Sequence, residues 1–340
     1  MRENKNLSWV RVNKNNRCPI CHKTDWCLLA ADGTAVICAR IESAIDAGSK
    51  GAGWVHRLDD SVKPVVMRDV AAHFPLAAIE RRDLAYNCLL SALTLSDLHR
   101  ENLYQRGLSD RDIDDLGYKT ISHDCTDGIV QRIKGITRLA GIPGFYLENG
   151  AVRLSSPSGT LIPVRDAEYR IQALQVRCDN TEHGKYKWVS SNGKYLGCSS
   201  GTPIHISHQD NLQNQEIWIT EGALKADVAA IKLRKCILAV AGVANWRGII
   251  PVILELKPSW VVVAFDMDKR TNELVQRHCK DMEQALLQIT NDVFEADWNS
   301  DYKGLDDFST SSTFSTSSTS SSVLDIFRPV SASFDKGANQ

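Results

Sequence analysis

The segment CPICHKTDWCLLAADGTAVIC, at residues 18–38, concentrates cysteines near the start of the chain. It holds four of the ten cysteines, which are Cys18, Cys21, Cys27 and Cys38. In a reducing compartment such a cluster favours a metal site over disulfides. A Cys-x-x-Cys knuckle presents two thiolates to one ion, so the first pair of cysteines already forms half of a site.

The second pair of cysteines is expected to meet across a hairpin. Asp32-Gly33 is typical of a two-residue type I′ turn, and pairing around it sets Cys27 opposite Cys38. Their Cβ atoms would lie about 4.5–5.5 Å apart, which suits two sulfurs at about 2.3 Å from one tetrahedral zinc ion. We expect His22 to point away. Four thiolates close the coordination shell, so we predict one structural zinc; the alternative is two disulfides or four unrelated buried cysteines.

We expect a cytoplasmic protein with several domains. At 340 residues the chain exceeds what one hydrophobic core usually organises, and we expect two or three domains. The formal net charge of −1 excludes a wholly basic coat protein but allows local basic surfaces. The polar start lacks the apolar core of a secretory signal. The strongest apolar run, residues 260–265, is too short to cross a bilayer, so we expect no membrane partner.

Four regions differ in composition and pattern. Residues 1–60 carry the cysteine cluster, residues 61–210 begin helical and continue with strands, and residues 211–308 alternate strand and helix. Residues 309–340 form a tail that we expect to be disordered, because the tandem FSTSST repeat can bury little apolar surface. Within the tail, VLDIFRPV is either a partner-docking peptide or an apolar piece without a role.

The second and third regions predict an α+β part followed by an α/β part. Ser109 and Asp112 resemble a capping box that opens a helix at DRDIDDL, and Gly117 ends it. GTLIPVRDAEYRIQALQVRCDN alternates like two strands around a polar turn. Further on, EIWIT, CILAVAG, WVVVAFD and DVFEADW are near-continuous apolar strands, with helices at GALKADVAAIKL and ELVQRHCKDMEQALLQI. This alternation is typical of a parallel sheet covered by helices.

Acidic residues follow two of these strands. Glu221 ends EIWITE and precedes a glycine, while Asp266 and Asp268 lie at the end of the segment WVVVAFDMDK and project on one side at a spacing of two. Sites in open α/β sheets form beyond the carboxyl ends of strands, so the three carboxylates can converge. Converging carboxylates need a cation, and oxygen ligands favour Mg²⁺ or Mn²⁺. Such sites commonly serve phosphoryl chemistry.

The segment DYKGLDDF adds Lys303, Asp306 and Asp307 after another strand. Acids at strand ends are often only solvated caps, and for an isolated Asp-x-Asp pair that interpretation would suffice. The order of strand-Glu-Gly, Asp-x-Asp and Lys-Gly-x-Asp-Asp along one chain favours a functional site instead.

These motifs resemble a known family. TEG, FDMD and KGLDDF look like a Toprim domain, the fold shared by bacterial primases, topoisomerases and some nucleases. LYQRGLSDRDIDDLGY, LIPVRDAEYRIQALQVR and KYKWVSS are similar to the catalytic core of DnaG-type primases, which a zinc module also precedes. The resemblance covers about residues 18–308 and looks closest to compact replication proteins of plasmids and phages. It implies a zinc ribbon or knuckle, a mixed α+β primase core and a parallel Toprim sheet.

The resemblance implies template-directed synthesis of RNA primers from nucleoside triphosphates, in DNA replication of mobile genetic elements. The implied catalytic residues are Glu221, Asp266 and Asp268, and the implied Mg²⁺ or Mn²⁺ ligands are these three with Asp306. Arg177 and Lys185 match basic positions that face template or nucleotide, and we count Lys187 and Lys303 with them. Residues 161–195 also interleave basic with aromatic side chains, a pattern that suits single-stranded DNA.

Two other functions remain open from the sequence. A Toprim-family nuclease would share the carboxylates, and a non-catalytic zinc-bearing protein that binds single-stranded DNA would share the zinc module. A type IA topoisomerase is disfavoured because the chain has little room for a strand-passage region. No G-x-x-x-x-G-K-[ST] motif is present, so we expect any replicative helicase to be a separate partner chain.

The cysteine cluster predicts one zinc ion per chain. Replacing Cys27 or Cys38 by serine should remove the zinc together with the local fold, because a structural zinc supplies folding free energy. Metal analysis of the purified protein measures this directly. A folded wild-type protein without zinc would contradict the assignment.

Overall fold

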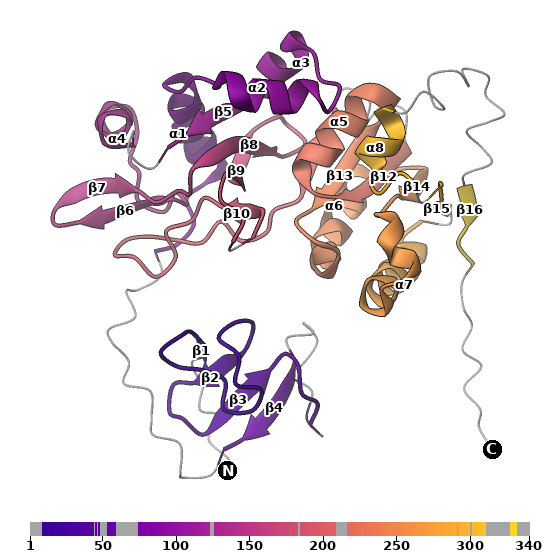
Figure 1. Cartoon of the computed structure of the whole chain (residues 1–340), viewed down its shortest axis with the longest axis horizontal. Coiled ribbons are helices and arrows are strands. Elements are labelled where there is room, and N and C mark those ends of the chain that lie inside the picture. Colours follow the sequence, from indigo (N-terminus) through magenta and orange to yellow (C-terminus); the bar gives the residue numbers. More distant parts are fainter. Residues whose placement is uncertain are drawn as a thin grey trace. The chain divides into compact units, whose positions relative to one another are not determined.

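The structure is a computed structural model of the whole chain. It describes residues 9–43, 45, 47, 53–58, 74–122, 126–182, 184–208, 216–290, 292–299, 301–310 and 327–331, apart from the side chains of 126, 127 and 268. The chain folds into two units, Met1–Val70 and Ala71–Gln340 (Figure 1).

The strands are β1 (Trp9–Arg11), β2 (Leu28–Ala30), β3 (Ala35–Cys38), β4 (Trp54–Arg57), β5 (Lys119–Ile121), β6 (Phe145–Glu148), β7 (Ala151–Leu154), β8 (Gly159–Arg165), β9 (Ile171–Cys178), β10 (Tyr186–Trp188), β11 (His205–Ser207), β12 (Glu216–Glu221), β13 (Cys236–Val240), β14 (Trp260–Val263), β15 (Val293–Ala296) and β16 (Phe327–Pro329). The helices are α1 (Ile79–Ser91), α2 (Asp97–Tyr104), α3 (Asp110–Leu116), α4 (Thr126–Lys134), α5 (Ala223–Leu233), α6 (Ile249–Leu256), α7 (Glu273–Leu287) and α8 (Leu305–Thr310), with 3₁₀ turns η3 (Val243–Gly248) and η4 (Met267–Arg270).

The first unit is an antiparallel sheet in the order β1-β2-β3-β4. Strands β2 and β3 pair Leu28 with Ile37 and Leu29 with Val36, which is the register predicted from the hairpin. The predicted type I′ turn is wrong, because Asp32 does not adopt the positive φ that this turn requires at both central positions. Instead Asp32 Oδ1 accepts hydrogen bonds from the backbone and hydroxyl of Thr34, while Gly33 takes φ +75°.

The second unit begins with helices packed along a four-stranded antiparallel sheet in the order β10-β9-β8-β5 (Figure 1). The two strands predicted around a polar turn are β8 and β9, which pair over Gly159–Arg165. Helix α3 has the predicted capping box: Ser109 and Asp112 each accept the other's backbone N–H, and Gly117 closes the helix at φ +75°. Hydrogen bonds and a glycine within the segment itself therefore set where this helix begins and ends.

The third region forms a six-stranded sheet in the order β11-β13-β12-β14-β15-β16. The pairs β12–β13, β12–β14 and β14–β15 are parallel, as predicted, while β11 and β16 add antiparallel edges. Strand β11 lies before residue 210 in the chain yet joins this sheet. All four predicted strands and both predicted helices of this region are present.

Helices cover both faces of this sheet because alternate residues of its strands point to opposite sides. In β12, Ile217 and Ile219 pack in one apolar cluster with Met282 of α7. Trp218, between them, packs in another cluster with Ala226 of α5. A strand that is buried on both faces reads as a continuous apolar run in the sequence, which is why it was recognisable.

A buried carboxylate joins helix α5 to its neighbours. Asp227 is 2% exposed and accepts hydrogen bonds from Tyr118 Oη at 2.5 Å, from His205 Nε2 at 2.8 Å and from Ser207 Oγ. The backbone N–H of Arg165 donates to His205 Nδ1, so the imidazole carries its proton on Nε2. Burial opposes ionisation of Asp227, but its three donors outweigh this effect and lower its pKa.

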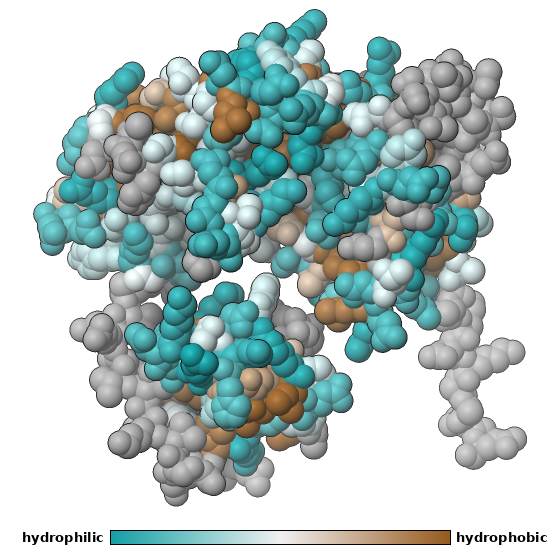
Figure 2. Space-filling view, in the orientation of Figure 1, coloured by the Kyte–Doolittle hydropathy of each residue, from teal (hydrophilic) through white to brown (hydrophobic). Residues whose placement is uncertain are grey.

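Parts of the tail at residues 309–340, which we expected to be disordered, form secondary structure. Helix α8 continues to Thr310, and β16 adds to the sheet with Phe327 against Trp218 and Trp260. Most of the FSTSST repeat, at residues 311–319, lies outside the described residues. Within the described part of the chain, no helix has the length and apolarity that crossing a membrane requires. The visible face of the second unit is mostly hydrophilic (Figure 2).

Replacing Asp227 by alanine should lower the free energy of unfolding by about 3 kcal/mol, because three buried donors lose their shared acceptor. Chemical denaturation of the full chain measures the effect. Asp292→Ala, which removes an exposed carboxylate, serves as the control and should change stability by less than about 0.5 kcal/mol. Equal stability of the two variants would contradict the role assigned to Asp227.

Candidate functional site

The four clustered cysteines of the first unit form a metal-ligand set. Their sulfur atoms all lie within 4.8 Å of one another, and Cys18, Cys27 and Cys38 are fully buried. The Sγ atom of Cys27 lies 3.6 Å from that of Cys21 and 4.0 Å from that of Cys38. Four sulfurs at about 2.3 Å from a tetrahedral zinc ion would be about 3.8 Å apart, so the cluster suits one zinc ion.

The four sulfurs differ in how readily they form thiolates. Burial raises the pKa of Cys18 and raises that of Cys27 to about 12, whereas backbone N–H groups and a guanidinium favour the charged form. The N–H groups of Ala39 and Ile41 donate to the sulfurs of Cys27 and Cys38, and the Arg40 guanidinium lies 3.9 Å from Cys21 Sγ. Burial opposes ionisation of Cys21, but hydrogen bonds from the Lys23 backbone and the neighbouring thiols lower its pKa to about 6. His22 is not part of the cluster, as expected.

The sheet of the second unit brings acidic residues to the carboxyl ends of neighbouring strands. Glu221 is the last residue of β12, and Asp266 follows β14, which pairs with β12 in parallel. Gly222 has φ +84°, which lets the chain turn sharply from β12 into α5. Asp268 lies in η4, and its side chain is outside the described part of the structure. Its predicted role therefore stays a prediction.

Asp306 joins Asp266 from a distant part of the sequence. The backbone N–H of Met267 donates to the carbonyl of Lys303 at 2.9 Å, which ties the segment before α8 to the loop after β14. Asp306 is 5% exposed, and its buried Oδ1 has no hydrogen-bond partner among the residues that the structure describes. A methyl group at Gly304 would lie 2.6 Å from this oxygen and 3.2 Å from Asp266 Oδ1. The two oxygens therefore line the same small space beside the glycine.

A divalent cation fits this donor set. Mg²⁺ and Mn²⁺ prefer oxygen ligands, and the carboxylate oxygens of Asp306 and Asp266 beside Gly304 could supply two of them. Burial, with the nearby Asp307 charge, raises the pKa of Asp306. A cation beside Asp306 would favour its charged form.

Two cations that the sequence interpretation did not assign are paired with these carboxylates. Arg106 Nη1 donates to Asp306 Oδ2 at 2.8 Å, and Lys225 Nζ lies 2.5 Å from both oxygens of Asp266. Both residues lie within the motifs YQRGLS and TEGALKADVAA, but the spacing of those motifs does not reveal which carboxylate each one meets. Burial would lower the pKa of Lys225, yet the Asp266 carboxylate raises it.

Predicted basic residues gather beside the acids. Burial lowers the pKa of Lys185, and so do the positive charges of Arg106, Arg177, Lys225 and Lys303. Arg106 and Arg177 also line a polar pocket of about 270 Å³ together with Asp306 and Asp307. The charge of Lys187 acts on Cys178, at the end of β9. Arg177, Lys185 and Lys303 are thus close enough for their charges to interact, and the role of Lys187 stays a prediction.

The aromatic residues of the basic stretch have mixed roles. Tyr186 and Trp188 are half-buried against the apolar cluster that includes Ile162 and Leu224. Tyr169 and Tyr195 are 44% and 61% exposed. The second pair is therefore the more exposed of the two, and the sequence pattern alone did not separate the two pairs.

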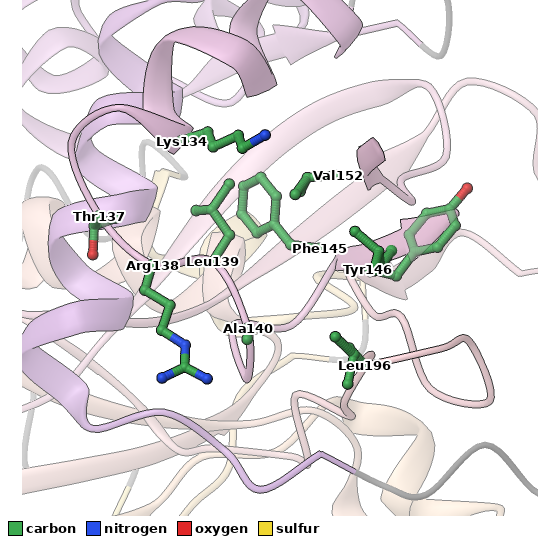
Figure 3. A pocket seen from close by; sticks show the side chains of 10 residues that line it. Lys134, Thr137, Arg138, Leu139, Ala140, Phe145, Tyr146, Val152 and Leu196 are labelled. Carbon is green, nitrogen blue, oxygen red and sulfur yellow. The ribbon is translucent and has the colours of Figure 1, made fainter. Parts of the chain in front are cut away.

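A second pocket, of about 220 Å³, lies away from these groups between α4 and the β6–β7 hairpin (Figure 3). Its lining is mainly apolar, with Phe145, Leu139 and Val152 facing the space and Lys134 and Arg138 at its edge (Figure 3). None of the predicted site residues lines it. The acidic and basic side chains of the candidate site lie instead at the carboxyl end of the parallel sheet.

The chain is similar in fold to solved primase structures. The crystal structure of the zinc-binding and RNA polymerase domains of the Aquifex aeolicus primase matches with a TM-score of 0.58 and 12% identity, over 75% of this chain and 63% of that one. The RNA polymerase domain of Mycobacterium tuberculosis primase DnaG matches with a TM-score of 0.56 and 13% identity, over 73% and 83%. A DnaG primase catalytic domain bound to single-stranded DNA matches with a TM-score of 0.55 and 13% identity, over 74% and 81%.

The fold is that of DnaG-type primases. At such low identity the similarity concerns the fold alone, and it confirms the predicted likeness to the zinc-binding and RNA polymerase domains of DnaG-type primases. The Toprim assignment and the origin in plasmids or phages stay predictions. No protein-family model matches the sequence, and no curated protein sequence matches it. The chain spans 63% of the Aquifex aeolicus structure that it matches.

Replacing Gly304 by alanine should weaken Mn²⁺ binding at least tenfold, because the added methyl group would occupy the space between Asp306 Oδ1 and Asp266 Oδ1. Calorimetric titration of Mn²⁺ into the full chain measures this change. Gly128→Ala is the matched control, since a methyl group there meets nothing within 4 Å. Equal affinity in both variants would show that the space beside Gly304 holds no cation.

Proposed function

We propose that the chain is a DNA-dependent primase that synthesises short RNA primers on single-stranded DNA. In this reaction the 3′-hydroxyl of one nucleotide attacks the α-phosphorus of a nucleoside triphosphate, a phosphodiester bond forms and pyrophosphate leaves. The observation that carries the proposal is the meeting of Asp266 and Asp306 with a basic cluster, in a fold shared with DnaG primases.

Glu221, Asp266, Asp268 and Asp306 are the residues that would hold Mg²⁺ or Mn²⁺. When bound, the cation supplies positive charge at the reacting phosphate. Arg106 and Arg177, in the polar pocket beside Asp306, are placed to bind phosphate oxygens of the incoming triphosphate or of the template. Lys185 and Lys303 extend this positive surface, which a polyanionic substrate would neutralise.

The single-stranded template is the proposed macromolecular partner. One of the similar structures is a DnaG catalytic domain bound to single-stranded DNA, and this likeness supports a template on the corresponding fold here. The zinc module, the cytoplasmic location, the separate helicase and an origin in plasmids or phages belong to the same proposal. The zinc module rests on the cysteine cluster, and the origin rests on the sequence resemblance.

A synthesis assay separates the possible functions. The full chain is incubated with single-stranded DNA, Mg²⁺ and labelled ribonucleotides. A primase yields short labelled oligonucleotides, a Toprim nuclease shortens the DNA, and a DNA-binding protein without activity does neither. Shortened DNA or unchanged DNA without oligonucleotides would contradict the proposal.

Asp266→Ala should reduce primer synthesis at least a hundredfold, because a lost metal ligand removes several kcal/mol of charge stabilisation in the transition state. Binding of single-stranded DNA, measured by fluorescence anisotropy, should stay within about twofold of wild type. Asp281→Ala, which replaces an exposed aspartate of α7, is the control and should retain full synthesis. Unchanged synthesis by Asp266→Ala would refute the assigned site.

A further inference from the structure

Lys225 occupies an electrostatically unusual position. It is the third residue of α5, where the positive end of the helix dipole disfavours a cation. Its ammonium nevertheless contacts both oxygens of Asp266 at 2.5 Å. Its charge also acts on Asp306, and it is itself acted on by the carboxylate of Glu221. The carboxylates that surround the ammonium compensate the unfavourable helix end.

The ammonium lies in the space that a cation held by Asp266 would need. Both Asp266 oxygens are engaged by Nζ, so a divalent ion that binds either of them meets a positive charge at contact distance. The Cε atom of Lys225 is 3.5 Å from the position of a methyl group on Gly304, and the same position is 2.6 Å from the unpartnered Asp306 Oδ1. Lys225 and that oxygen therefore border one small space.

We propose that Lys225 is a built-in counter-cation that competes with the divalent metal for Asp266 and thereby sets the metal affinity of the site. The proposal rests on the metal role in the proposed function and adds a residue that regulates it. Without metal, the ammonium neutralises carboxylates that would otherwise repel one another. Metal binding displaces the ammonium from Asp266, and the cost of that displacement weakens the apparent affinity.

Removing the charge of Lys225 should then have two opposite effects. The site becomes more negative by one charge, so a divalent ion binds more tightly. The metal-free protein loses the neutralising partner of Asp266, so it becomes less stable and gains more from added metal. If the salt bridge between Lys225 and Asp266 had only a structural role, removing the charge would lower the stability without raising the affinity for the metal.

The test uses the zinc-loaded full chain and Mn²⁺ as the probe. Oxygen ligands suit Mn²⁺, whereas thiolates select zinc, so the cysteine cluster does not contribute to the titration. By calorimetry, Lys225→Met should bind Mn²⁺ at least tenfold more tightly than wild type, while Lys225→Arg, which keeps the charge, should stay within about threefold. Lys232→Met replaces an exposed lysine of the same helix and should leave the affinity unchanged.

Thermal denaturation gives the second measurement. Lys225→Met should unfold at a lower temperature than wild type without Mn²⁺, and saturating Mn²⁺ should raise its melting temperature by more than it raises that of wild type. An unchanged or weaker Mn²⁺ affinity in Lys225→Met would overturn the proposal. If this variant does not fold, Lys225→Gln retains a hydrogen bond to Asp266 without the charge and carries the same expectation.

The outcomes distinguish this inference from the proposed function. Tighter Mn²⁺ binding by Lys225→Met, with no primers from wild type, would support the counter-cation and contradict the primase. Primer synthesis by wild type, with equal Mn²⁺ affinity in wild type and Lys225→Met, would support the primase and contradict the counter-cation. Equal Mn²⁺ binding by wild type and Asp266→Ala would overturn the counter-cation, because the metal would then not compete for Asp266.

Discussion

Like charges gathered at the carboxyl end of the parallel sheet are the constraint around which the second unit is arranged. Asp266 and Asp306 are both almost fully buried, and buried carboxylates are stable only beside cations or donors. Lys225 meets that need from helix α5, and Arg106 meets it from the turn after α2. The pairings connect α5, the loop after β14, the start of α8 and the turn after α2. The site and the packing of these elements therefore depend on the same contacts.

The apolar core supports this arrangement from both faces of the sheet. Alternate residues of β12 pack on α7 and on α5, so the strand that ends in Glu221 is held on both sides. The Asp227 network then joins α5 to Tyr118 and to β11. A site formed at the end of such a strand rests on elements that are packed on both faces of the sheet.

Much of the fold was predictable because it depends on local patterns. The capping box of α3, the strand pair β8–β9 and the parallel strands each have a signal within a few consecutive residues. The cysteine hairpin kept its predicted register although its turn was wrong, because the pairing depends on the strands more than on the turn. The edge strand β16 was missed, since its apolar residues pack on side chains far away in the sequence.

The types of ligand could be read from the residues without any knowledge of the fold: a Cys-x-x-Cys pair, two cysteines at hairpin spacing, and carboxylates at the ends of buried strands. They follow from residue chemistry and from the periods of two and 3.6 residues that strands and helices impose. Which cation each carboxylate meets became known only from the folded chain. Arg106 and Asp306 are 200 residues apart, and no local pattern encodes a contact over that separation. Which side chains meet in the site is decided by how the helices pack against the sheet.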